Sequence, residues 1–265
     1  TRKGGVFRGK DMDKKPTDIW ETIHKGSYPE LYDVDRDLQD FYSSYVATYL
    51  ERDINDLITA DSLTFAKFMT SVAARTGEML NYANIASEVG VSEPTIKSWI
   101  SVLERTGIVY ILQPYSASAL YRAIKTSKIY FRDTGLACYL TRWISADALK
   151  NSAVAGNMFE TFVVSEILKS YINEGRDYRF SIFYYRGKDK RASGDNEIDL
   201  VIHEDGIIYP VEIKMTGNPK ATMGSTNQVL DKVQDKKRGM GTILCLVDKK
   251  TYLRENLLAL PIKYI

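Results

Sequence analysis

The chain has 265 residues, 44% of them hydrophobic, which is enough for one large domain or two ordinary ones with a buried core. Its 36 Lys and Arg residues nearly balance 34 Asp and Glu residues, so no strong overall field would attract nucleic acid or membranes, although a local basic patch stays open. There is no membrane-spanning apolar run and no signal peptide, and the only cysteines, Cys138 and Cys245, are far apart. We therefore expect a cytoplasmic protein with buried thiols and no membrane contact. Because it begins at Thr1 and not at Met, we expect a fragment or a processed chain.

The first half of the chain is predicted to be mainly helical. Asp18 lies near a helix start in PTDIWETIHKG, and GSYPELY interrupts that helix. Residues 33–58 carry apolar side chains at helical spacing and predict one long amphipathic helix. A further helix is expected to begin after the N-cap candidate Asp61 and to end near Gly77.

Residues 82–105 have the spacing of a helix-turn-helix. The pattern predicts a first helix over residues 82–89, a turn at Gly90, and a second helix capped by Ser92 with Pro94 in its first turn. Three apolar side chains fall on the inward face of the second helix: Ile96, Ile100 and Leu103.

The outward face of the second helix is ambiguous as a DNA contact. In DNA-binding versions of the motif this helix enters the major groove, and its candidates here are Lys97 and Ser98. The same face carries Glu93 and Glu104, whereas each phosphate contact favours a cation, so protein contact stays an equal alternative. A strand in GIVYILQPY opens a predicted wing over about residues 108–130. The basic residues of this wing are Arg122, Lys125 and Lys128.

The second half of the chain changes to an α/β pattern. KIYFRDTGLACYL predicts a strand and a helix, and AGNMFETFVVSEILKSYIN predicts an apolar helix. FSIFYYR, EIDLVI, GIIYPVEIK and TILCLV predict strands, with a helix around TNQVLDKVQDKK between the last two. The expected class is α/β (α+β), with a mixed sheet flanked by helices. The domain boundary is placed between residues 139 and 156, which gives domains 1–145 and 146–265.

Charged residues stand inside two of these strands. Alternation along a strand puts every other residue on a solvated face, so Asp199 or Glu212 alone is more readily explained as outward-facing. A hairpin at Gly206 would, however, bring the two carboxylates together, and buried carboxylates resist ionisation unless a cation neutralises them. Mg²⁺ binds through one or two carboxylates, so both become candidate metal ligands. Lys214, on the same strand face as Glu212, would hold the attacking water or stabilise charge on phosphate.

This arrangement resembles the PD-(D/E)xK nuclease superfamily. An Asp on one strand is followed by Glu-x-Lys on the next, and Glu160 on the upstream helix matches a further acidic position, although Ile198 replaces the proline. The resemblance implies a restriction-endonuclease-like sheet and Mg²⁺-dependent phosphodiester hydrolysis. The catalytic residues that it implies are Asp199, Glu212, Lys214 and Glu160. Many such domains keep the fold without the chemistry, so a catalytically inactive platform stays open.

Nearly the whole chain is similar to a prokaryotic family of AAA-type ATPases. GSYPELY, YVATYLERDI, the helix-turn-helix, KIYFRDTGLACYL, GNMFETFVVSEIL and EIDLVI…YPVEIK occur in the family's order. These proteins carry an N-terminal P-loop domain and a C-terminal domain of unknown function 4143. The resemblance implies a winged helix, a nuclease-like C-terminal domain and an ATPase domain that is missing upstream. A binding or regulatory platform for the ATPase is the alternative function, and a toxin-like or defence role is a third.

Two short segments need separate interpretation. GGVFRGKD, residues 4–11, imitates a phosphate loop, but Asp11 replaces the required hydroxyl residue, so we expect neither a nucleotide site nor ATPase activity in this fragment. RGKDKR, residues 186–191, is predicted to be a loop that is either merely solvated or contacts the backbone of DNA or another nucleic acid. Its candidate contacts are Arg186, Lys188, Lys190 and Arg191. KKR, residues 236–238, is expected to end a helix. An oligomer stays open.

Overall fold

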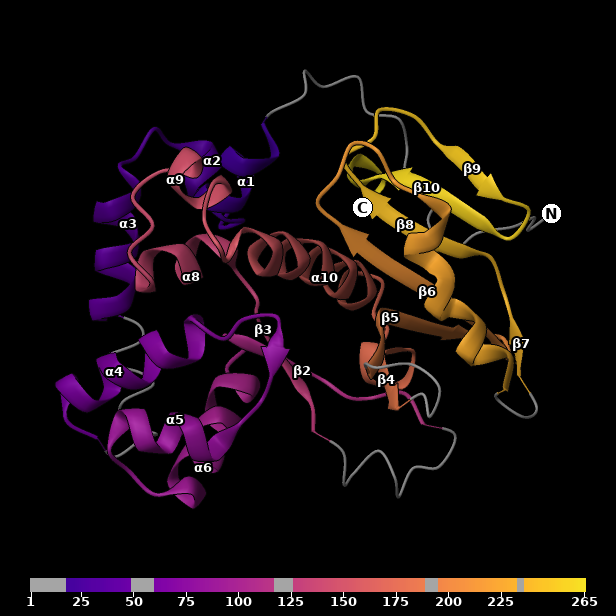
Figure 1. The fold of residues 1–265 in the computed structure, drawn as a ribbon. Helices are drawn as coiled ribbons and strands as arrows, with labels where there is room; N and C mark the ends of the chain where they lie inside the picture. Colours follow the sequence, from indigo (N-terminus) through magenta and orange to yellow (C-terminus); the bar gives the residue numbers. More distant parts are fainter. Residues whose placement is uncertain (1–17, 49–59, 117–125, 189–194, 233–235) are drawn as a thin grey trace. The chain divides into compact units, whose positions relative to one another are not determined.

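The computed structural model describes residues 18–48, 60–116, 126–188, 195–232 and 236–265 (Figure 1). The chain forms two compact units that are interleaved in sequence. We call the described residues of Lys14–Ile111 and Ile129–Ser165 the helical unit, and those of Leu112–Lys128 and Glu166–Ile265 the sheet unit. Helices and a mixed multistranded sheet confirm the predicted α/β class. The GGVFRGKD segment and the four basic candidates Arg122, Lys125, Lys190 and Arg191 lie outside the described residues.

The helical unit contains most of the helices and a small three-stranded sheet in the order β1-β3-β2. Three of its elements, β2, β3 and α10, cross the unit boundary, since Leu112 of β2 and Lys128 of β3 belong to the sheet unit. The elements are α1 (Ile19–Lys25), α2 (Glu30–Asp33), α3 (Leu38–Tyr45), α4 (Ser62–Ala73), β1 (Glu78–Met79), α5 (Tyr82–Val89), α6 (Glu93–Arg105), β2 (Val109–Leu112), β3 (Lys128–Phe131), α8 (Thr134–Leu140), α9 (Ala146–Lys150) and α10 (Ala155–Asn173).

The helix-turn-helix forms as predicted. Gly90 takes a left-handed conformation between α5 and α6, with φ of 85°. The Ser92 hydroxyl accepts the backbone N–H of Thr95, so α6 begins where the capping residue indicated. The three inward apolar side chains of α6 are buried, and Trp99 also packs inward, with its ring centroid 5.1 Å from that of Phe68. The motif therefore folds around its own apolar face and that of α4.

The long helix predicted over residues 33–58 begins later than expected. The Asp37 carboxylate accepts the N–H groups of Gln39 and Asp40, and this cap starts α3 at Leu38. Residues 49–58 lie outside the described part of the chain, so the predicted length is not tested there. The helix after Asp61 forms as α4, since that carboxylate accepts the N–H of Thr64 at 2.9 Å.

A buried carboxylate connects several elements of the helical unit. Asp133 Oδ2 accepts the backbone N–H and the hydroxyl of Ser27 at 2.6 and 3.0 Å. Its Oδ1 accepts the Tyr42 hydroxyl at 2.8 Å and the N–H of Leu136 at 2.7 Å. Burial and the Asp133 carboxylate together raise the pKa of Tyr42. Asp133 therefore caps α8, and it also binds Ser27, which follows α1, and Tyr42 of α3.

The sheet unit is built on a seven-stranded mixed sheet in which β4-β5-β6-β8-β10-β9 are neighbours and β7 pairs with β6. β4, β5 and β6 are antiparallel neighbours, whereas β6 and β10 both run parallel to β8. The elements are η2 (Tyr178–Phe180), β4 (Ile182–Lys188), β5 (Asp195–Glu204), β6 (Ile207–Lys214), η3 (Ala221–Lys232), β7 (Lys237–Arg238), β8 (Gly241–Cys245), β9 (Thr251–Arg254), β10 (Leu257–Pro261) and η4 (Ile262–Tyr264).

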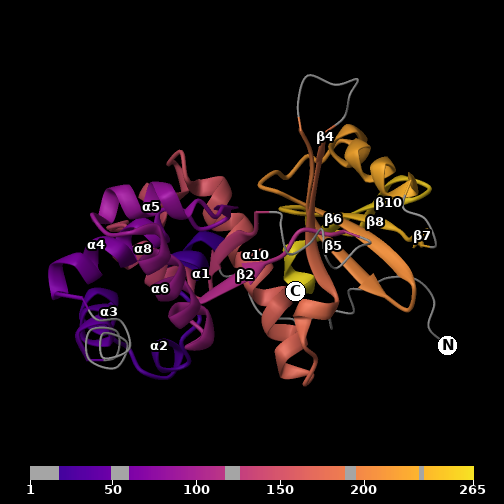
Figure 2. The same ribbon diagram turned by 90° about the horizontal axis from the view of Figure 1, so that it is seen from below.

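The helical segment η3 covers one face of this sheet (Figure 1, Figure 2). Leu230 packs with Ile198, Val201 and Ile208 in a core cluster, and Met223 packs against the core of β8 and β10. The helix predicted here is therefore present, but it is a 3₁₀ helix that begins at Ala221 and kinks at Gly224.

One assignment near the end of the chain was wrong, and two strands there were missed. KKR was predicted to end a helix, but Lys237 and Arg238 form β7, and the Arg238 guanidinium pairs with Asp231 at 2.6 Å. The strands β9 and β10 were not predicted.

A two-residue turn, Asp205-Gly206, closes the β5–β6 hairpin. Both residues have positive φ, 49° and 76°, and Glu204 pairs with Ile207 on either side. This is the turn geometry that matches the twist of paired strands, and Asp-Gly is a sequence that favours it. The hairpin predicted from Gly206 is confirmed.

Replacing Gly206 with alanine is expected to lower the free energy of unfolding by about 1 kcal/mol. No atom of the described residues beyond its chain neighbours lies within 4 Å of an added Cβ, so the cost comes from the positive φ alone. Urea denaturation measures it, with Gly156→Ala as the control, because Gly156 lies in α10 without positive φ and is equally unobstructed. Equal stability of the Gly206 variant and the wild type would contradict this account.

Candidate functional site

The candidate site is a group of three side chains, Asp199, Glu212 and Lys214, which we call the carboxylate centre. Glu212 and Lys214 lie two residues apart on β6, so both project from the same face of the strand. Asp199 lies on the adjacent strand β5, next to the last regular pair, Leu200 with Val211. The hairpin therefore brings together the three residues that sequence spacing had singled out.

A β-bulge directs Asp199 into this group. Phe183 of β4 pairs with Val201 of β5, but Tyr185 pairs with Ile198, so one residue of β4 faces two residues of β5. Asp199 is one of these two. Bulges redirect side chains and interrupt pairing, and here the Asp199 carboxylate, not a backbone carbonyl, accepts the N–H of Ile213 at 2.7 Å.

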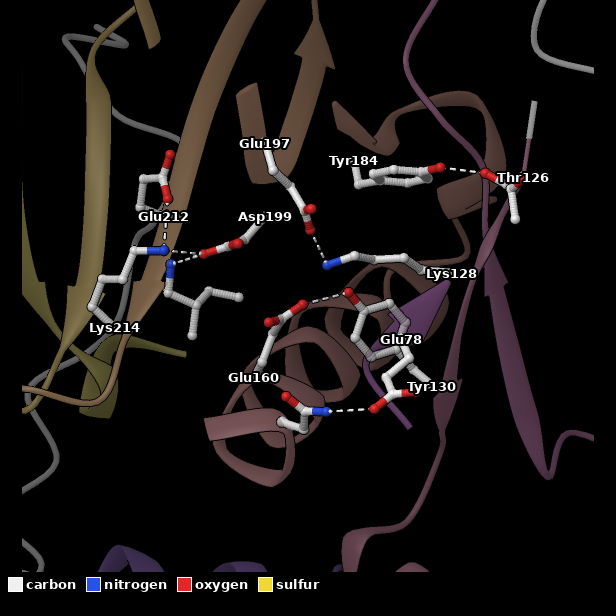
Figure 3. Close-up of polar contacts among 12 residues, drawn as sticks. Glu78, Thr126, Lys128, Tyr130, Glu160, Tyr184, Glu197, Asp199, Glu212 and Lys214 are labelled. Atoms are coloured by element: carbon white, nitrogen blue, oxygen red, sulfur yellow. Dashed lines mark hydrogen bonds and ion pairs between the residues drawn. The ribbon is translucent and has the colours of Figure 1, made fainter. Parts of the chain in front are cut away.

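The Lys214 ammonium joins the two carboxylates (Figure 3). Its Nζ lies 3.0 Å from Asp199 Oδ2 and 2.8 Å from Glu212 Oε2. The carboxylates are deeply placed, since the side chain of Glu212 is 3% exposed and that of Asp199 is 11% exposed, whereas that of Lys214 is 34% exposed. The cation is therefore the most accessible member of the centre.

The electrostatics of the centre are those of two buried acids with one shared counter-ion. Burial, followed by the Asp199 carboxylate, raises the pKa of Glu212 to about 7, and Lys214 only partly opposes this rise. Burial alone would lower the pKa of Lys214, but the two carboxylates more than offset it and raise that pKa. With both acids ionised, the centre carries a single negative charge.

One oxygen of the centre is left over. Glu212 Oε1 is buried and has no hydrogen-bond partner among the described residues. A buried carboxylate oxygen without a partner is costly, and a proton or a metal cation would satisfy it. The donor set of two carboxylates fits a hard cation such as Mg²⁺. No group of three or more His, Cys, Asp or Glu side chains is gathered for a metal within the described ranges, so Asp199 and Glu212 are the protein ligands that such an ion would have.

Glu160, the fourth predicted catalytic residue, belongs to the helical unit. It lies on α10, and its Oε1 accepts the hydroxyl of Tyr130 at 2.7 Å. Its role remains a prediction.

The predicted nucleic-acid contacts in the described residues lie on two elements, the helix α6 and the strand β4. Lys97 and Ser98 are exposed on α6, but the Lys97 ammonium pairs with Glu93 at 2.8 Å and lies 5.3 Å from the centroid of the Tyr82 ring. The loop assignment of Arg186 and Lys188 was wrong, because both lie in β4. Arg186 stands opposite Glu197 in the ladder between β4 and β5.

Lys128 was wrongly assigned to an exposed basic wing. It begins β3, is buried, and pairs through Nζ with Glu197 Oε1 at 2.6 Å (Figure 3). Glu197 was not among the predicted site residues, although it lies two residues before Asp199 on β5 and alternation would place both on one face. Its carboxylate is close enough to contribute to the raised pKa of Glu212.

None of the helices in the described ranges is both long and apolar enough to span a membrane.

Comparison with known proteins finds matches to two families described as domains of unknown function. Residues 16–147 match the family described as DUF8612, and residues 155–265 match the family described as DUF4143. The uncharacterized proteins Rv2008c of Mycobacterium tuberculosis and Mb2031c of Mycobacterium bovis are each 27% identical over 191 residues, which is 71% of this chain. The matched region spans 40% of the length of each relative. The prediction of a DUF4143 domain in the C-terminal part of the chain is confirmed.

Proposed function

We propose that the sheet unit is a nuclease-like domain that binds nucleic acid and hydrolyses phosphodiester bonds with Mg²⁺. The observation that carries this proposal is the buried Oε1 of Glu212, beside Asp199 and Lys214, for which the described part of the chain supplies no hydrogen-bond partner. Two carboxylates on adjacent strands, with one oxygen left over, make a suitable site for a hard divalent cation. Bound Mg²⁺ would act as a Lewis acid and would lower the pKa of a coordinated water.

The charge of the carboxylate centre favours a phosphodiester over a neutral substrate. Two ionised carboxylates and one ammonium sum to a single negative charge, which a divalent cation would convert to a single positive charge. One phosphodiester anion would then neutralise the site. Because the side chain of Lys214 is partly exposed, its ammonium can turn from the carboxylates towards a phosphate and stabilise charge there.

Nucleic acid is the proposed substrate class, because basic residues accompany the strands of the centre. Arg186 and Lys188 lie on β4, next to the strand that carries Asp199. Because the matched region is a minor part of each relative, and because the sequence resembles AAA-type ATPases, we place this domain in a longer protein with an ATPase domain.

A catalytically inactive platform for that ATPase is the second candidate. The observation that favours it is the double ion pair of Lys214, which already satisfies one oxygen of each carboxylate. Breaking both contacts to admit a metal would cost free energy, whereas a fixed ion-paired group would keep the strand ends in place without chemistry.

Calorimetric titration with Mn²⁺ separates these two functions. We expect the wild type to bind the ion and Asp199→Ala/Glu212→Ala to bind it at least about tenfold more weakly, because both proposed ligands are lost. Asp248→Ala/Glu255→Ala is the matched control, since it removes two exposed acids of the same unit and should bind like the wild type.

The outcomes are distinct. Mn²⁺ binding that depends on Asp199 and Glu212 would justify cleavage assays on DNA and RNA with Mg²⁺, in which the double variant should be inactive. No binding by the wild type at millimolar Mn²⁺, with nucleic acid present, would reject the catalytic function and leave the platform.

A further inference from the structure

Two described segments lie between β2 and β3, residues 113–116 and residues 126–127, and both belong to the sheet unit. At the first segment, the N–H of Tyr184 donates to Gln113 O at 3.1 Å, and the N–H of Tyr115 donates to Tyr184 O at 2.6 Å. At the second segment, the Tyr184 hydroxyl donates to Thr126 O. A hydrogen bond of 3.1 Å from Ser127 to Gln113 joins the two segments. The backbone leading into Lys128 is therefore fixed to β4.

This anchoring holds the Lys128 ammonium in a buried position. Its side chain is 5% exposed, and Nζ lies 2.6 Å from Glu197 Oε1 and 5.9 Å from the centroid of the Tyr184 ring (Figure 3). Desolvating an ammonium is expensive, and a buried ion pair is often no more stable than an apolar pair of the same size. The pair is therefore better explained by where it places charge than by added stability.

Glu197 is the carboxylate that this placement controls. It lies two residues before Asp199 on β5, and Arg186 is its cross-strand neighbour on β4. Its side chain is 34% exposed, so the carboxylate would be free to turn if the buried ammonium did not hold it. Without that counter-charge, a third negative group would face the same ion as Asp199 and Glu212.

We propose that Lys128 is a positioning residue that withholds Glu197 from the carboxylate centre and so leaves the divalent cation to Asp199 and Glu212. The inference rests on the proposed function of that centre. It assigns Glu197 as a latent third carboxylate and makes the buried ion pair a determinant of how strongly the centre attracts a metal.

The test is Mn²⁺ titration of the whole chain at pH 8, comparing wild type with Lys128→Met. Because removing the Lys128 ammonium makes the net charge near the ion more negative by one, we expect Mn²⁺ to bind about tenfold more tightly. Lys128→Met/Glu197→Gln should return to wild-type affinity. Lys169→Met removes an ion-paired lysine elsewhere in the sheet unit and should change nothing.

A purely structural role predicts the opposite direction, because a distorted centre would bind Mn²⁺ less tightly and Glu197→Gln would not reverse the change. If Lys128→Met fails to fold, Glu197→Gln alone tests the inference. It removes the negative charge beside the Lys128 ammonium, so one net positive charge is added near the ion and binding should weaken by about fivefold.

Two failures can be told apart. Equal or weaker Mn²⁺ binding by Lys128→Met, or unchanged binding by Glu197→Gln, overturns the inference while wild-type binding preserves the proposed function. No Mn²⁺ binding by the wild type overturns both.

Discussion

Asp133→Ala is expected to lower the free energy of unfolding by about 3–5 kcal/mol, which would unfold many domains of this size at moderate temperature. The substitution removes the shared acceptor of the backbone N–H groups of Ser27 and Leu136. It also removes one of two acceptors of the Tyr42 hydroxyl, which keeps Lys25 O at 2.8 Å. Each buried donor without a partner costs about 1–3 kcal/mol. Urea denaturation followed by circular dichroism measures the loss.

Asp61→Ala is the control for this prediction. Asp61 caps α4 as Asp133 caps α8, but it is exposed and its partners lie within its own helix. Its loss should cost about 1 kcal/mol, the ordinary value of an N-cap. The excess for Asp133 isolates the contacts to Ser27 and Tyr42. Equal losses for the two variants would show that these longer-range contacts contribute nothing.

Asp133 shows which structural features a local sequence pattern can predict and which it cannot. The pattern strand-then-helix in KIYFRDTGLACYL gave β3 and α8 correctly, because N-caps and periodicity act within a few residues. The buried role of Asp133 depends on Ser27 and Tyr42, which are distant in sequence, so no local pattern could reveal it.

The missed elements of the sheet unit have the same origin. β10 is a run of five residues that pairs in parallel with β8, and β7 has only two residues beside β6. Short apolar runs do not distinguish strand from helix, and a parallel partner is chosen by the fold rather than by a turn. The β5–β6 hairpin was predictable because the turn at Gly206 specifies its own geometry.

In the carboxylate centre, spacing identified Asp199, Glu212 and Lys214 but not their setting. The bulge that directs Asp199 arises from its register with β4, which no single strand encodes. Lys128 was mistaken for an exposed cation because its burial depends on Glu197, a residue of another element. The sequence therefore predicted which residues form the centre, whereas their ion-pair partners were known only from the structure.

Glu212→Gln is expected to change how stability depends on pH. Because the folded state raises the pKa of Glu212 to about 7, from an ordinary value of 4.5, the folded protein holds this proton more strongly than the unfolded chain does. The stabilisation is fully present below the unfolded pKa and is lost as pH rises through about 7. Glutamine cannot ionise, so the variant avoids this loss. In the presence of EDTA, its stability relative to wild type should increase by about 2–3 kcal/mol between pH 5 and pH 8.

Urea denaturation at several pH values between these limits measures the difference, with Glu255→Gln as the control. Glu255 is exposed on the same unit, so its variant should differ from wild type by a constant amount at every pH. Parallel curves for Glu212→Gln and wild type would mean that Lys214 keeps Glu212 ionised at every pH tested, so that no proton occupies the buried Oε1. Diverging curves would mean that a proton satisfies the buried Oε1 below neutral pH, at the position that the proposed function assigns to a divalent cation.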